Sequence, residues 1–110
     1  MPMFEERERA FEAKYAHDEE FQFLLTARRD KLVAGRVADR LAMEGRDRAA
    51  LTLAVLAVPD GPSHDALLVE HLKGTLLDRG SIVGDAEMAA LLVDCAAQAR
   101  QQLLETPDAR

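Results

Sequence analysis

Apolar residues recur at intervals of three and four along most of the chain, which is the period of an amphipathic α-helix. In the first part of the chain they predict one long helix over about residues 4–43, roughly 60 Å long if fully helical. Its apolar stripe consists of Phe21, Leu24, Leu25, Leu32, Val37, Ala38 and Leu41. We expect Gly45 to stop this helix, because glycine adopts left-handed backbone conformations without steric cost.

Three shorter helices are predicted over about residues 48–57, 64–79 and 86–105. Each follows a residue that can accept a hydrogen bond from free amides of the first turn; these are Asp47, Ser63 and Asp85. The stripes are Leu51, Ala54, Val55 and Val58; Leu67, Leu68, His71, Leu72 and Leu76; and Met88, Leu91, Leu92, Cys95, Ala96, Ala99 and Leu103. Residues 59–62, Gly80 and Pro107 are expected to end them. The sequence therefore predicts an all-α protein, a four-helix bundle with a long first helix.

Composition narrows the class of protein. The 110 residues suit one domain, and their net charge of −6 argues against a general binder of nucleic acid or of anionic membranes. The longest apolar run, residues 51–58, is far too short to span a bilayer. The acidic start of the chain has no apolar stretch of the kind found in signal peptides. With a single cysteine, no intrachain disulfide can form, so a cytoplasmic location is expected.

The aromatic residues are all concentrated in the first 23 positions, as Phe4, Phe11, Tyr15, Phe21 and Phe23. Residues 1–20 contain seven acids and three bases, which leaves too little apolar surface for a core. On a helix, the first three aromatics would share one stripe, suited to insertion into a groove of another protein. Folding back onto the chain's own bundle is the open alternative. We interpret residues 1–17 as a largely disordered arm that becomes helical when bound, and residues 18–110 as the bundle.

The residues of this region resemble a known family. The resemblance lies in Phe4, residues 7–12 (Arg-Glu-Arg-Ala-Phe-Glu), residues 14–20 (Lys-Tyr-Ala-His-Asp-Glu-Glu), Phe23, residues 27–29 (Ala-Arg-Arg), and Lys31-Leu32. Together they are similar to the signature of the zeta subunit, the small inhibitor of the F-type ATP synthase in α-proteobacteria. Beyond residue 32 the similarity is limited to length and to the four-helix pattern.

The resemblance implies a specific function. Members of this family are four-helix proteins whose amino-terminal arm enters a catalytic αβ interface of the synthase head, contacts the central stalk and blocks rotation, and with it ATP hydrolysis. Carried over residue by residue, the inhibitory segment would consist of Phe4, Arg7, Glu8, Phe11, Glu12, Lys14 and Tyr15. The implied partner is the catalytic head and central stalk at the cytoplasmic face of the membrane-bound synthase, with no membrane insertion and a monomeric free protein.

The chain departs from the family pattern just after the arginine pair. Where a leucine-glycine-leucine-tryptophan-like run is usual, the sequence reads Val33-Ala34-Gly35-Arg36. A glycine within a helix costs about 1 kcal/mol relative to alanine. The docking surface of the bundle is therefore expected to differ from that of other members. A helical adaptor that has lost the inhibitory activity remains the alternative function.

Other candidate chemistry is weaker. His64 and His71 could share a helix face but would lie about 10 Å apart along the axis, so no metal site is expected. We predict that His71 is partly buried and that Cys95 is a small buried hydrophobe. Residues 28–31 (Arg-Arg-Asp-Lys) could attract a phosphate or a nucleotide, but we interpret them as a solvated, salt-bridged helix face. No pair of acids has a recognisable catalytic setting, so neither an enzyme nor a cofactor is expected.

Overall fold

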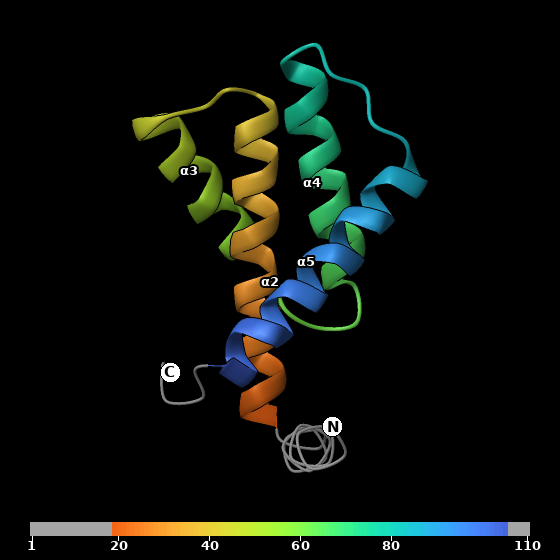
Figure 1. Ribbon diagram of the computed structural model, residues 1–110. Coiled ribbons are helices and arrows are strands. Elements are labelled where there is room, and N and C mark those ends of the chain that lie inside the picture. The colour runs from red at the N-terminus through yellow and green to blue at the C-terminus, as the bar shows by residue number, and fades with distance from the viewer. Residues whose placement is uncertain (1–18, 106–110) are drawn as a thin grey trace.

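A computed structural model describes residues 19–105, and within this range the chain forms four α-helices and no strand (Figure 1). The helices are α2 (Glu19–Arg40), α3 (Gly45–Leu56), α4 (His64–Asp78) and α5 (Asp85–Glu105). The all-α, four-helix fold is thereby confirmed, with α2 the longest of the described helices at 22 residues. The expected beginning of the first helix near Phe4 and the stop at Pro107 both lie outside the described residues.

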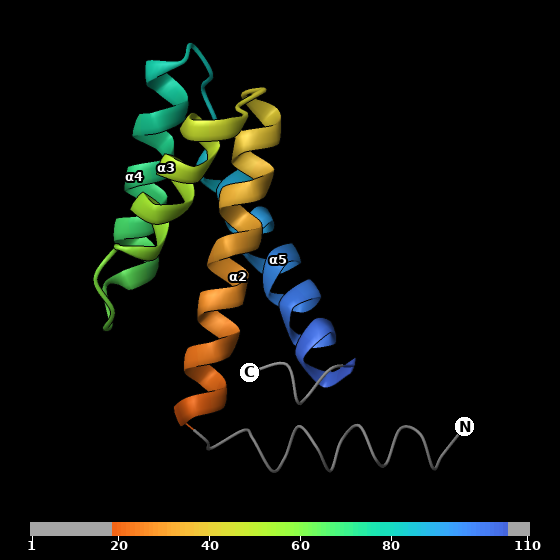
Figure 2. The same cartoon turned by 90° about the vertical axis from the view of Figure 1, so that its left-hand side faces the viewer.

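Helix α2 lies at the centre of the arrangement. Figures 1 and 2 show α5 crossing it obliquely, and α3 lying against its carboxyl-terminal half. Its most extensive contacts are with α5 and then with α3. Side chains that bridge α2 and α5 pair Arg28 with Gln102 and Arg40 with Glu87, so the two helices run antiparallel. The first and last described helices therefore form the main interface of the fold.

The buried core is divided into two clusters. The larger one includes residues of all four helices, of the α2–α3 connection and of the α4–α5 connection. Its members are Val33, Ala34, Val37, Ala38, Met43, Leu51, Val55, Leu68, Leu72, Leu76, Val83, Met88 and Cys95. The smaller one joins Phe21 to Leu103, with Leu24 and Leu25 packed against them. The apolar stripes predicted for the four helices supply most of both clusters, so the helical period located the core correctly.

Two of the helices end in the same backbone motif. In α4 the amide of Gly80 donates to the carbonyl of Leu77, and the amide of Ser81 donates to that of Leu76. This is a Schellman motif with glycine at the left-handed position (φ 80°), as predicted. Helix α2 ends in the same way at Arg40, three residues earlier than expected, but here Ala42 takes the left-handed position with φ 53°.

The predicted start of α3 is wrong. Gly45 does not stop the preceding helix; it is the first residue of α3, which begins three residues before the expected position. Glu44 occupies the N-cap position with an extended backbone, and Asp47 lies within the first turn. Because Ala42 already reverses the chain, the connection lies three residues earlier than expected, at residues 41–44 instead of 44–47. Ser63 does precede α4, but its side chain makes no capping hydrogen bond.

The buried face of α4 is narrower than the predicted one. Residues at a strict spacing of four are buried, namely His64, Leu68, Leu72 and Leu76. Leu67 and His71 were expected on this face, but both are exposed. They form a parallel row one position earlier, turned by about 100° around the helix axis, and this row is exposed. The predicted partial burial of His71 is therefore wrong.

Candidate functional site

The predicted inhibitory segment lies outside the described residues. Its members are Phe4, Arg7, Glu8, Phe11, Glu12, Lys14 and Tyr15, and the described chain begins at Glu19. The part of the family signature that the structure does describe is the amino-terminal half of α2, from Glu19 to Leu32. The candidate site in the described residues therefore consists of this half-helix and of what packs against it.

Two aromatic residues fall in this half-helix, and they have opposite environments. Phe21 is buried against Leu103 of α5. Phe23, two positions on and therefore on the other side of the helix, is 62% exposed. A large apolar side chain left in water is available for contact with another molecule.

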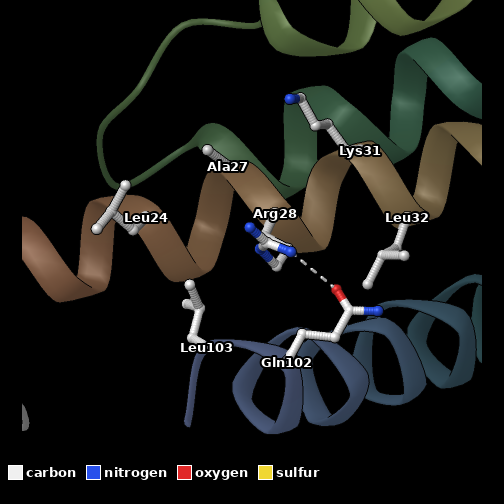
Figure 3. Close-up of a pocket in the computed structure, with 7 residues that line it drawn as sticks. All are labelled: Leu24, Ala27, Arg28, Lys31, Leu32, Gln102 and Leu103. Atoms are coloured by element: carbon white, nitrogen blue, oxygen red, sulfur yellow. Dashed lines mark hydrogen bonds between the residues drawn. The ribbon is translucent and has the colours of Figure 1, made fainter. Parts of the chain in front are cut away.

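A shallow groove runs between α2 and the end of α5 (Figure 3). Its volume is about 290 Å³, and it is lined by Leu24, Ala27, Arg28, Lys31, Leu32, Gln102 and Leu103. The leucines give it an apolar floor, while Arg28 and Lys31 place two positive charges at its edge. Arg28 is held in position by a hydrogen bond of 3.2 Å from its Nη1 atom to Oε1 of Gln102, drawn in Figure 3.

A cluster of charged residues lies on the α4 side of the same half-helix. Asp30 is 2% exposed, and its Oδ1 atom accepts a hydrogen bond of 2.9 Å from Nε of Arg29. The Arg29 guanidinium also donates two hydrogen bonds to the carboxylate of Asp65, at 2.7 and 3.2 Å. The predicted salt bridging of residues 28–31 is thus confirmed for Arg29 and Asp30, but Asp30 is buried rather than solvated.

His64 completes this cluster. It is 8% exposed, with its Nε2 atom 2.7 Å from Oδ2 of Asp30 and its Nδ1 atom 2.9 Å from the carbonyl oxygen of Pro59. Burial alone would lower the pKa of His64, but the hydrogen bonds to Pro59 and Asp30 and the charge of Asp30 outweigh burial and raise it. The hydrogen bonds from Arg29 lower the pKa of Asp65 in the same cluster.

The four residues that depart from the family pattern have separate environments. Val33 and Ala34 are fully buried in the larger core cluster. Gly35 faces α3, where a Cβ atom would lie 3.5 Å from the Arg48 guanidinium. Arg36 is on the surface beside α5, with a hydrogen bond of 3.0 Å to Gln98. The arginine at the position where tryptophan is common therefore belongs to the polar rim of the α2–α5 interface.

The candidates for metal binding were His64 and His71, and the single thiol is that of Cys95. His64 and His71 do not converge, because one faces α2 and the other faces solvent. Among residues 19–105, no three His, Cys, Asp or Glu side chains are grouped so that they could hold a metal ion. Cys95 is fully buried, as predicted, and this burial raises the pKa of its thiol. A thiol held in its protonated form is a packing residue of the core.

The fold and these surfaces define a small all-α protein organised around one central helix. The family model described as "ATPase inhibitor subunit zeta" matches residues 1–102, and the chain therefore belongs to this family. No curated protein and no solved structure gives a significant match. Family membership confirms the resemblance seen in residues 4–32. It gives the protein an inhibitory, regulatory role and implies interaction with ATP synthase. None of the helices within residues 19–105 is long and apolar enough to cross a membrane.

Proposed function

We propose that this protein inhibits ATP hydrolysis by the F-type ATP synthase by inserting its amino-terminal arm, residues 1–17, into the catalytic head. The inserted helix would contact the central stalk and block its rotation. The inhibitory segment is Phe4, Arg7, Glu8, Phe11, Glu12, Lys14 and Tyr15. Residues 18–110 form the bundle that carries the arm. The protein acts on the cytoplasmic head of the membrane-bound enzyme and is a monomer when free.

The observation that carries this proposal is the extent of the family match. It begins at residue 1 and continues to residue 102, so it includes the arm as well as most of the four helices. The arm is also the part of the chain in which the family residues are densest. Both observations support the proposal that the arm carries the inhibitory role of the family.

The physical chemistry of the arm supports the same assignment. Phe4, Phe11 and Tyr15 would form one aromatic stripe on a helix, with charged residues on the remaining faces. Desolvated aromatic anchors of this kind supply most of the binding energy at protein interfaces. Ordering of the arm on binding would subtract conformational entropy from that energy, which suits a reversible inhibitor.

The arrangement of α2 supports a role for the bundle as a support for the arm. The chain enters α2 at Glu19, and this helix is continuous to Arg40. Its carboxyl-terminal half is buried in the larger core cluster, so the amino-terminal half is fixed in direction by a rigid element. An arm attached to such an element is presented at one defined end of the molecule.

The test compares Phe11→Ala with Glu12→Ala, neighbouring changes on the arm, in titrations against ATP hydrolysis by the purified synthase of the same organism. Phe11→Ala is expected to weaken inhibition roughly thirtyfold, because truncating a desolvated anchor costs about 2 kcal/mol or more. Glu12→Ala is the matched control, and as a rim charge it should cost less than about 1 kcal/mol.

Two results would contradict the proposal. Equal inhibition by Phe11→Ala and the wild-type protein would exclude Phe11 as an anchor. Absence of inhibition by the wild type would favour the helical adaptor instead. Thermal unfolding of the same variants tests the free arm separately. An unchanged melting temperature in Phe11→Ala is expected, and a large decrease would mean that Phe11 belongs to the protein's own core.

A further inference from the structure

Two parts of the chain that are distant in sequence, α2 and the start of α4 with the connection before it, meet at the His64 imidazole. Asp30 comes from the middle of α2, Pro59 from the connection between α3 and α4, and His64 itself is the first residue of α4. Each ring nitrogen faces one oxygen: Nδ1 faces the Pro59 carbonyl at 2.9 Å and Nε2 faces the Asp30 carboxylate at 2.7 Å. These three groups form what we call the Asp30–His64 clasp.

The number of protons on the ring decides whether both contacts are favourable. A carbonyl oxygen only accepts hydrogen bonds, and so does an ionised carboxylate. A neutral imidazole has a single N–H, so it can satisfy one of the two oxygens and turns a lone pair toward the other. Only the imidazolium, with two N–H groups, donates to Pro59 and Asp30 together.

Asp30 belongs to an ion-pair cluster of which His64 is only one member. Its second oxygen accepts a hydrogen bond from Arg29, whose guanidinium is itself bound by Asp65. These are the charged groups that face the ring: Arg29 and Asp30 from α2, and Asp65 from the first turn of α4. With an imidazolium the four charges cancel. With a neutral ring, two carboxylates share one guanidinium, and the cluster carries an uncompensated negative charge. Asp65 is open to water, but Asp30 and the ring are buried, so the lost compensation is felt at Asp30.

We propose that the Asp30–His64 clasp is a pH-dependent contact. It holds the α3–α4 connection and the start of α4 against α2 when His64 is protonated, and it weakens when His64 is neutral. The part that moves would be the segment from Pro59 to His64, because α4 beyond it is anchored by Leu68, Leu72 and Leu76 in the larger core cluster. The device goes beyond the proposed inhibition and does not depend on it.

The direction of the effect follows from the raised pKa of His64. A histidine whose pKa is higher in the folded protein stabilises the fold fully below its unfolded value of about 6.5. This stabilisation is lost as the pH rises through the higher folded value. The clasp is therefore closed below the ordinary pKa of histidine and opens as the pH rises through the higher folded value.

The first experiment is an NMR titration of the histidine rings in the wild-type protein. We expect His64 to titrate above the usual range for histidine, with both ring nitrogens protonated below its midpoint. Backbone signals of residues 59–64 and of Asp30 should shift with the same midpoint, while those of Phe21 and Leu103 should not follow it. A His64 midpoint at or below the usual value would overturn the proposal without any variant being needed.

The second experiment follows urea unfolding between about pH 6 and about pH 9. The urea midpoint of the wild type is expected to fall over this range. In His64→Gln the fall should be absent, because the glutamine amide can donate to Asp30 but has no proton to lose. His71→Gln is the matched control: it removes an exposed histidine from the same helix and should retain the wild-type profile. A His64→Gln profile that still falls like the wild type would overturn the proposal.

Discussion

The two halves of α2 are parts of one continuous helix, yet they are held in different ways. The carboxyl-terminal half buries Val33, Ala34, Val37 and Ala38, none more than 2% exposed, in a cluster that includes all four described helices. The amino-terminal half buries only Phe21 and Asp30. One of these belongs to a small apolar cluster with Leu103, and the other to a set of ion pairs.

One half of α2 therefore serves mainly to stabilise the fold, and the other half offers surfaces for contact with other molecules. The carboxyl-terminal half stabilises the fold, because its small and β-branched side chains pack in the core without contact with water. The amino-terminal half combines exposed Phe23, the cationic groove of Figure 3 and the polar cluster around Asp30. It is also the half that continues into the family's signature residues. Regions with few buried apolar contacts open locally at lower free energy than the core.

The largest expected effect on the free energy of unfolding comes from shortening a leucine to alanine. The same change is compared in the larger and in the smaller core cluster. Leu72→Ala removes a side chain that is fully buried in the larger cluster, and we expect a loss of about 3 kcal/mol in the free energy of unfolding. Leu103→Ala acts on the small cluster beside the groove, where the surroundings can relax or admit water, and a smaller loss of about 2 kcal/mol is expected. Urea unfolding at one pH measures both, and equal losses would contradict the division of the core.

An intermediate effect is expected from Gly35→Ala. The residue lies inside α2, and an added Cβ atom would be 3.5 Å from Nη2 of Arg48, which is an ordinary contact distance. The change should raise the free energy of unfolding by about 1 kcal/mol, because alanine favours a helix interior over glycine. Gly74→Ala in α4 is the control, since nothing lies within 4 Å of that Cβ position. A gain at Gly74 with a loss at Gly35 would show that α3 packs too closely to admit the methyl group.

The smallest effect is expected at the surface charges that join α2 to α5. Arg40 pairs with Glu87 at 2.7 Å, and both side chains are about half exposed. Arg40→Gln should therefore lower the free energy of unfolding by only about 0.5 kcal/mol, and less at high salt. Arg28 lies in the other half of α2, and Arg28→Gln loses a hydrogen bond to the uncharged Gln102 of α5. The loss in free energy of unfolding should therefore show no salt dependence. Thermal unfolding at two salt concentrations distinguishes these outcomes.

The helical architecture could be predicted because its signals are local and repeated. Leu68, Leu72 and Leu76 recur with the helical period, and Gly80 marks the end of α4, so the element and its stop were both correctly placed. The end of α2 could not be predicted in this way. Ala42 adopts a left-handed conformation that alanine ordinarily avoids, and only tertiary packing can impose it.

The polar cluster was missed for a related reason. Asp30 stands in a run of four charged residues, a pattern that usually marks a solvated face. Its burial depends on His64, 34 positions away, and no local pattern connects the two. One signal was present in the sequence: His64 continues the spacing of four set by Leu68, Leu72 and Leu76, which places it on the buried face. The family resemblance, by contrast, was carried by contiguous residues and is confirmed by the family match.

The pairing of α2 with α5 has a consequence for the order of events during synthesis. The chain is made from its amino terminus, so α2 leaves the ribosome first and its main partner leaves last. Glu105 stands 65 residues beyond Arg40, which corresponds to roughly 3 to 13 seconds of translation at about 5 to 20 residues per second. During that interval the apolar face of α2 can meet only α3 and α4. The nascent chain therefore completes its principal interface only after α5 has emerged, and until then the face of α2 that α5 covers stays open to chaperones and to other chains.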